Sequence, residues 1–494
     1  MSRILALYDI TGIQDYIFKT NKLKDIIGSS RFVEEVFKTI PCELLETNGA
    51  KQIYSGGGNA IFSFATEEDY REFNRKFSRK LLLQTPGIQF VTTFTRQSEN
   101  LSNNIDCLFE KMSQKKNISL QSYDFSTLPP MAQSPEDRQQ VIWHDEDPID
   151  GGDLSFAIKR KRCMGKEIIN NDSQMGKMKD FDEIACPFIP QSKNMMAVVH
   201  IDGNNMGKLL RAAFEDVSKT DEITNISKQI DIAFSNAVAA TEAQLLQIER
   251  SETKKNSCEK IRDYPHFRLI YQGGDDVTFI CHSCYALEAV QTFFKTLLKN
   301  KKDKLSDLSA SAGIAYIKPH YPFNKAYQIA CKCCENAKRK AKNRKDHIDV
   351  GFWLDYEIVM STDPSSTMDI YKARPYYVYG LENENNGINI GVLMALLNTL
   401  RDFSHSKLKD LRDAFLYGSE NFVSAQLKSI GQLIEGGYRL YTGKADSINE
   451  VDFQINDSGY LIGKNINAVY DALEILDINR TPIFHPQEKE SVII

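Results

Sequence analysis

Three carboxylates have the spacing that most suggests chemistry. Asp202 follows the apolar run Met195–Ile201, which is typical of a buried strand, and Asp275 with Asp276 lies at the Gly-rich turn of a predicted hairpin. The strand end and the hairpin tip can converge at one edge of a sheet. Close carboxylates repel unless a cation neutralises them, and oxygen ligands select Mg²⁺ or Mn²⁺. The pattern therefore predicts a divalent-metal site for phosphate chemistry, with these three aspartates as catalytic residues and metal ligands.

The glycines beside these acids have a role of their own. Gly203, Gly273 and Gly274 let the backbone approach a polyphosphate and adopt positive φ where a side chain would clash. A simpler interpretation is that Gly-Gly-Asp-Asp is only a good hairpin turn, because Asp and Gly are preferred there. The strand-ending Asp202, the hairpin and a later basic helix occur in the expected order along the chain. This order favours the nucleotide-binding interpretation.

The elements that must position these residues occur twice along the chain. The first copy has a strand at Ile4–Tyr8, a hairpin at Gln52–Phe64 with Gly56, Gly57 and Gly58 at its tip, and a helix at Glu67–Leu83. The second has the strand before Asp202, the hairpin around Asp275, and a long amphipathic helix within 223–248. A repeat this long predicts duplicated domains rather than a solenoid.

This pattern predicts that the chain is divided into four segments. We predict a first, degenerate unit at 1–105, an irregular insert at 106–190, a second unit at 191–360 with a helical insertion at about 216–262, and an α-helical domain at 361–494. The last rests on helical periodicity in Val392–Leu400, Leu408–Tyr417 and Phe422–Leu433.

Composition excludes several classes of protein. The chain has 494 residues, 42% of them hydrophobic, with 61 Lys+Arg against 66 Asp+Glu and a net charge of −5. These values exclude a small disulfide scaffold, a largely disordered chain and a uniformly basic surface. Its apolar runs are too short to span a bilayer, so we expect no membrane association and a cytoplasmic location.

One short motif suggests a zinc site as an alternative. Cys281-His-Ser-Cys284 has zinc-like spacing, but no second such pair stands nearby. Possible further ligands are Cys163 and Cys186 in the insert and Cys331, Cys333 and Cys334 on a predicted helix. We expect half-buried apolar cysteines instead.

Several motifs carry a resemblance to a known family. Asp202-Gly-Asn-Asn-Met-Gly207, Tyr271-Gln-Gly-Gly-Asp-Asp276 and Ser311 to Lys338 resemble the GGDD polymerase/cyclase palm in the large subunit of type III CRISPR effector complexes, which is related to diguanylate cyclase domains. The opening Asp9-Ile-Thr-Gly-Ile-Gln14 and the tip Gly56–Gly58 resemble the same subunit's first, degenerate palm. The resemblance implies an α+β fold with two ferredoxin-like palm domains.

The same resemblance implies a function and residue roles. It implies synthesis of cyclic oligoadenylate from ATP with Mg²⁺ or Mn²⁺, while guide RNA and target RNA are bound through other subunits of an antiviral complex. Asp202, Asp275 and Asp276 match the metal-binding acids, and Gly203 would add a carbonyl ligand. Lys338 stands at the position where the family has a phosphate-contacting lysine. The first palm would bind a nucleotide without catalysing the reaction.

Departures from the family pattern leave alternatives open. Asn204 stands where a second Asp is frequent, which leaves the number of metal ions open, and no HD nuclease domain fits before Asp9. A noncatalytic, nucleotide-binding scaffold subunit is therefore one alternative. Another is a synthase of a cyclic dinucleotide or a different adenylate.

Overall fold

The computed structural model describes most of the chain. The described ranges are 3–48, 50–56, 58–97, 101–117, 131–147, 151–174, 177–188, 193–206, 220–255, 264–301, 305–342, 351–359, 372–379, 388–401, 403–417, 432–434, 437–441, 450–455, 461–462 and 466–479. Gly57 lies outside them. Residues 208–217, which the sequence pattern predicts as a helix, also lie outside them.

Two sheets repeat one strand order. The first has the order β2-β3-β1-β4, and the second extends the equivalent order β8-β9-β7-β10 by two strands, β11 and β12. The strands of the first sheet are β1 (Ile4–Thr11), β2 (Lys51–Gly56), β3 (Asn59–Phe64) and β4 (Gln89–Arg96). Those of the second are β7 (Met196–Gly203), β8 (Phe267–Gly273), β9 (Asp276–His282), β10 (Ala310–Ile317), β11 (Phe352–Ile358) and β12 (Tyr376–Tyr379). A helical segment follows the first strand of each copy and a helix follows the third, so both units are βαββαβ folds of the ferredoxin-like kind, as expected.

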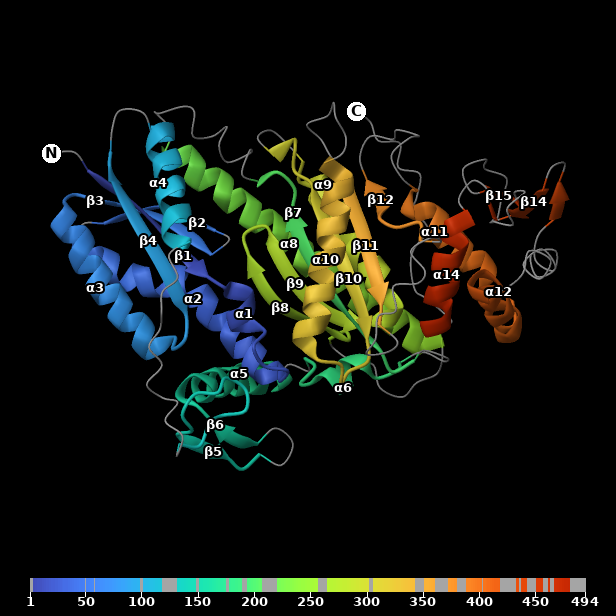
Figure 1. The fold of residues 1–494 in the computed structure, drawn as a ribbon, viewed down its shortest axis with the longest axis horizontal. Helices are drawn as coiled ribbons and strands as arrows, with labels where there is room; N and C mark the ends of the chain where they lie inside the picture. Colours follow the sequence, from blue (N-terminus) through green and yellow to red (C-terminus); the bar gives the residue numbers. More distant parts are fainter. Residues whose placement is uncertain are drawn as a thin grey trace.

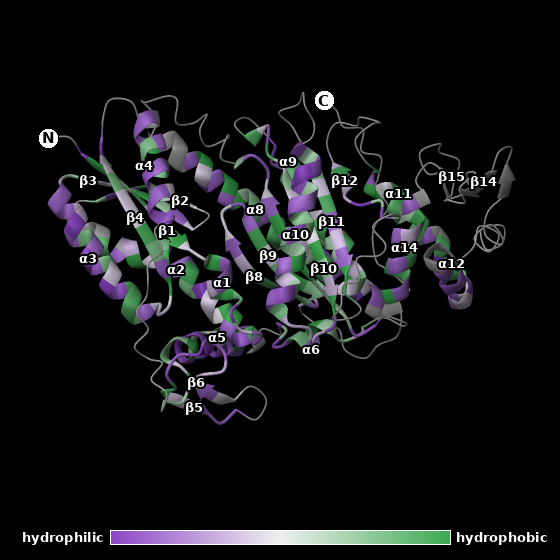
Figure 2. Ribbon diagram, in the orientation of Figure 1, coloured by the Kyte–Doolittle hydropathy of each residue, from purple (hydrophilic) through white to green (hydrophobic). Residues whose placement is uncertain are grey.

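Three helices accompany each of these sheets. They are α2 (Leu23–Asn48), α3 (Glu67–Gln84) and α4 (Leu101–Lys116) in the first palm, and α8 (Thr220–Lys255), α9 (Ala286–Lys299) and α10 (Phe323–Lys342) in the second. Along β7, Ala197 and Val199 belong to one hydrophobic cluster, while Met196 and Val198 belong to the other. Successive strand residues point to opposite faces, so both faces of this strand are buried. Figure 2 shows the matching hydrophobic interior of the second sheet.

The two palms lie side by side and share their cores (Figure 1). The long helix α8 crosses to β2 of the first palm, where the Ser227 hydroxyl donates to the Ser55 carbonyl at 3.3 Å. On the other side, the rings of Phe18 and Tyr327 lie with centroids 3.9 Å apart, and the Phe323 amide donates to Asn21. Side chains from both units thus bury one another, which fixes one palm against the other.

The insert has more regular structure than expected. It contains β5 (Trp143–Asp145), β6 (Gly152–Leu154), α5 (Phe156–Gln174) and α6 (Phe181–Ala185). Helix α5 packs on α2 at glycines, because a Cβ at Gly28 or Gly165 would overlap the facing backbone. The four consecutive basic residues Lys159–Arg162 predict a solvated charge patch or one that meets an RNA backbone. That prediction is wrong for Lys161 and Arg162, which are 2% and 1% exposed.

The C-terminal part is helical only in part. It contains α11 (Ile390–Leu400), α12 (His405–Tyr417) and α14 (Ile466–Ile478), and two of the three predicted helices are confirmed. Four strands, β13 (Gln432–Ile434), β14 (Gly437–Tyr441), β15 (Glu450–Ile455) and β16 (Leu461–Ile462), form a further sheet. The expectation of an all-helical segment is therefore wrong there. The end of the third predicted helix, Gln432 and Leu433, is in β13, and its start lies outside the described residues.

Two more features complete the fold. Strand β12 pairs with β11 beyond residue 360, so the second sheet extends past the expected domain boundary. Among the described residues, no helix is long and apolar enough to cross a membrane.

Candidate active site

The second sheet brings the predicted strand and hairpin acids together. Asp202, at the end of β7, lies directly opposite Asp276, the first residue of β9. The amide of Gly203 donates to the carbonyl of Asp275 at 3.2 Å, which joins the strand end to the hairpin tip. The predicted convergence of Asp202, Asp275 and Asp276 at one sheet edge is therefore present.

Glycines make the hairpin tip possible. Gly273 pairs with Asp276, so Gly274 and Asp275 form a two-residue loop, and Gly274 has φ +66°. A loop of this length with glycine at its first central position is a favoured hairpin turn. At Gly273 a Cβ would overlap the Tyr271 hydroxyl, and at Gly203 it would lie 2.8 Å from Asp275 Oδ2. A larger residue at Gly203 would therefore press on Asp275, and one at Gly273 would displace the Tyr271 ring.

Lys338 reaches the acids from α10. Its Nζ donates to the Gly203 carbonyl at 3.0 Å and forms an ion pair with Asp202 Oδ2. Asp202 and Gly203 are two of the predicted metal ligands, so the ammonium touches the oxygens assigned to the metal. The predicted site lysine is therefore in place.

The other two acids are held in a poorly solvated setting. Burial, and then the negative charge of Asp202, raises the pKa of Asp275 to about 7. Burial and the same neighbour raise the pKa of Asp276 well above its ordinary value. Its Oδ1 is buried and accepts no hydrogen bond from the described residues, although His200 Nδ1 lies 3.4 Å away. Burial lowers the pKa of His200 to about 4, so this imidazole is neutral and adds no positive charge.

These donors fit a hard divalent cation. All are oxygens, and one is a buried carboxylate oxygen without a hydrogen bond, which is the donor type that Mg²⁺ and Mn²⁺ prefer. Among the described residues, no group of three His, Cys, Asp or Glu side chains has the geometry of an assembled metal site. The acids share a sheet edge, but Asp202 is paired with Lys338.

Asn204 has a structural role next to the acids. Its side-chain oxygen accepts from the Ser311 hydroxyl at 3.0 Å, and its side-chain nitrogen donates to the Gly351 carbonyl at 3.3 Å. Both ends of the amide are therefore used in holding β7 to β10 and to the start of β11. An aspartate in the same position would face the Gly351 carbonyl with an acceptor, so the amide suits this site.

The first palm has the same frame with different side chains. Asp9 lies opposite Asn59 just as Asp202 lies opposite Asp276, and the Ile10 amide donates to the Gly58 carbonyl at 3.0 Å. Lys116, at the end of α4, forms a 2.7 Å ion pair with Asp9. Sequence reasoning missed Lys116. Its place at the end of the helix after the fourth strand, as with Lys338, was the available signal.

The zinc alternative gains no support in the described residues. Cys281 and Cys284 are buried, and burial raises the pKa of both thiols. No three-ligand group includes them. They belong to the same hydrophobic cluster as Tyr285, and they are fully buried where half-buried cysteines were expected.

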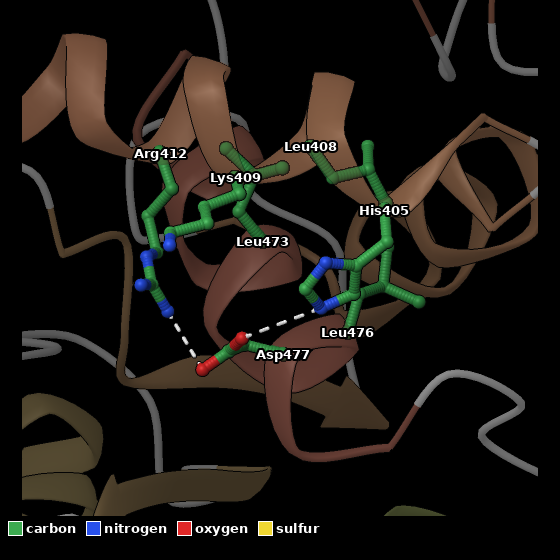
Figure 3. Close-up of a pocket in the computed structure, with 7 residues that line it drawn as sticks. All are labelled: His405, Leu408, Lys409, Arg412, Leu473, Leu476 and Asp477. Atoms are coloured by element: carbon green, nitrogen blue, oxygen red, sulfur yellow. Dashed lines mark ion pairs between the residues drawn. The ribbon is translucent and has the colours of Figure 1, made fainter. Parts of the chain in front are cut away.

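Two hollows lie away from the acids. Between α12 and α14, Asp477 forms ion pairs with Arg412 and His405 around a space of about 10 Å³ (Figure 3), which holds one water molecule at most. A cavity of about 340 Å³ lies beside the last turns of α10, and its lining includes Arg339, Asp355 and Lys372. The first is too small for a nucleotide, and neither is lined by the three predicted acids.

The second unit matches a known domain family. Residues 195–348 match the model for the second palm domain of Cas10/Cmr2. A curated relative, the CRISPR system single-strand-specific deoxyribonuclease Cas10/Csm1 (subtype III-A) of Methanocaldococcus jannaschii, is 24% identical over 236 residues. The match covers 45% of this chain and 28% of that relative, so the chain spans well under two thirds of it.

Solved structures show the same fold. The Csm1–Csm4 cassette in complex with AMPPNP has a TM-score of 0.54 at 12% identity, covering 97% of this chain and 70% of that one. The cassette in complex with pppApApA has a TM-score of 0.52 at 12% identity, covering 97% and 69%. The expected resemblance to the palm-domain subunit of type III CRISPR complexes is thus confirmed, and residues 195–348 form a second palm domain of the Cas10/Cmr2 type.

Proposed function

We propose that the second palm is a nucleotidyltransferase that makes cyclic oligoadenylate from ATP, within an RNA-guided type III CRISPR complex. The observation that carries the proposal is the pairing of Asp202 with Asp276 across β7 and β9, with Asp275 at the adjoining tip. The fold match to Csm1 with AMPPNP and with pppApApA supports a nucleotide as the ligand. Guide and target RNA would be held through other subunits of the complex.

Each residue would have a defined part in this reaction. A divalent ion on Asp202, Asp275, Asp276 and the Gly203 carbonyl would lower the pKa of a 3′-hydroxyl and stabilise a leaving pyrophosphate. Gly203, Gly273 and Gly274 allow the backbone to approach a triphosphate. Lys338 would neutralise phosphate charge. Gly56 to Gly58 of the first palm would bind a second nucleotide without catalysing.

The test measures both product and pyrophosphate. The full chain, alone and assembled with its complex and target RNA, is incubated with ATP and Mg²⁺ or Mn²⁺, and products are identified by mass spectrometry. We expect 3′–5′ linked adenylates, and at least about a thousandfold loss when Asp275→Asn and Asp276→Asn are combined, because the metal ligands lose their charge. The matched control is Asp307→Asn at an exposed position of the same palm, with unchanged turnover.

Other products would point to other functions. Unchanged turnover in the double variant would refute the site. A cyclic dinucleotide or another adenylate would keep the chemistry and change the product. The ion pair of Lys338 with Asp202 favours one further candidate, a noncatalytic nucleotide-binding scaffold. ATP binding without pyrophosphate release, under every RNA and metal condition, would identify that function.

A further inference from the structure

The position of Lys338 carries an inference about the order of binding. Its Nζ contacts Asp202 Oδ2 and the Gly203 carbonyl, two of the four groups that we assign to the metal. An ammonium and a divalent ion that contact the same oxygens repel each other, so the lysine weakens the binding of the metal ion there. The lysine side chain is 20% exposed and Asp202 is 37% exposed, so there is room for this ion pair to separate.

The first palm repeats the arrangement independently. Lys116, also from the helix after the fourth strand, contacts Asp9 at the position equivalent to Asp202. There the residues opposite are Gly58 and Asn59, which carry no negative charge. Once Asn59 is turned so that its amide nitrogen faces Asp9, it also donates to that carboxylate. One ammonium therefore balances the single carboxylate of the first palm, whereas three carboxylates surround the cation position in the second.

We propose that Lys338 is an internal cation that occupies the metal position of the nucleotide-free second palm and must move away when a divalent ion binds. This inference rests on the proposed function, because it takes the metal site from there. Asp275 and Asp276 supply two further carboxylates that a divalent ion can use as ligands, so the second-palm lysine is replaceable by such an ion. The first-palm lysine is permanent, since a single carboxylate there offers a divalent ion too little charge.

The position of Lys338 also couples the binding of the divalent ion to the binding of the nucleotide. Lys338 released from Asp202 needs a new anionic partner, and a triphosphate beside the acids supplies one. The free protein would then bind the divalent ion weakly, and binding would strengthen when the nucleotide takes the lysine. This coupling would keep the site from holding metal without substrate.

The experiment is a Mn²⁺ titration of the full chain without nucleotide, with free Mn²⁺ measured by electron paramagnetic resonance. We expect Lys338→Met to bind Mn²⁺ at least about tenfold more tightly than wild type, because the competing charge is gone. Lys338→Arg, which keeps a cation, should stay within about threefold of wild type. Lys116→Met is the matched control in the first palm and should gain no such site. Adding Asp275→Asn and Asp276→Asn to Lys338→Met should abolish the gain.

Two results separate this inference from the proposed function. If Lys338→Met binds Mn²⁺ no more tightly than wild type while wild type makes product from ATP, the inference is wrong and the proposed function stands. If Lys338→Met binds Mn²⁺ tightly but wild type releases no pyrophosphate from ATP under any condition, the inference stands and turnover is refuted. Circular dichroism and thermal melting of each variant exclude misfolding as the cause.

Discussion

Asp25, beside the first sheet, and Asp276, at the edge of the second, are held in different ways. In the first, buried charges are paired: Arg162 of the insert donates to both oxygens of Asp25 on α2, at 2.9 and 2.8 Å. In the second, the side chain of Asp276 is 27% exposed, and its buried Oδ1 accepts no hydrogen bond from the described residues. A paired buried charge supports the fold, whereas an unsatisfied one costs stability and leaves a ligand position open. The same βαββαβ fold thus contains a paired buried acid in one copy and holds an unpaired carboxylate oxygen at the sheet edge of the other.

The largest expected effect comes from breaking the paired charges. Arg162→Met leaves Asp25 buried without its partner, and should lower the free energy of unfolding by about 3–5 kcal/mol. The measurement is urea denaturation of the full chain at pH 7.5. The control Arg160→Met, at an exposed position of the same helix, should stay within about 0.5 kcal/mol of wild type. A loss below about 1 kcal/mol for Arg162→Met would break the comparison.

A pH-dependent effect should come from Lys161, the neighbour of Arg162. Burial, and then the positive charge of Lys19, lowers the pKa of Lys161 to about 7. Between this value and its ordinary pKa, the unfolded chain binds the proton and the folded chain does not, so stability rises with pH. Relative to Lys161→Met, wild-type stability should therefore rise by about 1.4 kcal/mol per pH unit above pH 7.

Urea denaturation of both proteins at pH 6, 7.5 and 9 checks this prediction. The difference between wild type and Lys161→Met should be constant below pH 7 and grow above it. Arg160→Met should follow wild type at every pH. A difference that does not change with pH would show that Lys161 keeps its ordinary pKa in the folded protein.

The smallest expected effect has the opposite sign and lies in the second palm. Asp276→Asn should raise the stability of the metal-free chain by about 1 kcal/mol, because the amide removes repulsion from Asp202 and Asp275. Thermal melting without divalent ions, beside the exposed control Asp307→Asn, measures it. A clear loss of stability would mean that Asp276 supports the fold as Asp25 does, and the contrast between the halves would disappear.

Local patterns in the sequence predicted the strands and turns that carry the proposed site residues. The hairpin tips, the strand before Asp202 and the helix at Glu67 were all readable, because alternation and Gly-rich turns are properties of short segments. The duplication was readable for the same reason. Both hairpins even carry an irregularity at matched positions, between Gln52 and Tyr54 and between Leu269 and Tyr271.

Contacts between distant segments could not be predicted in this way. The run 159–162 looked solvated, yet Arg162 is buried because it meets Asp25, more than a hundred positions earlier in the chain. The strands β13 to β16 were missed because strands of two to six residues carry a weak periodic signal. Lys116 looked like an ordinary basic helix end until its helix was placed over Asp9.

The amino-acid sequence by itself determined the duplicated strand–hairpin order and the residues that can carry charge to each sheet edge, because those depend on neighbours in the chain. Only the tertiary structure decided which charges are neutralised. It set Lys338 against Asp202 and Lys116 against Asp9, and left Asp276 Oδ1 without a hydrogen bond from the described residues. The physical reason is that burial and charge pairing depend on what packs around a group, and the packing partners come from distant parts of the chain.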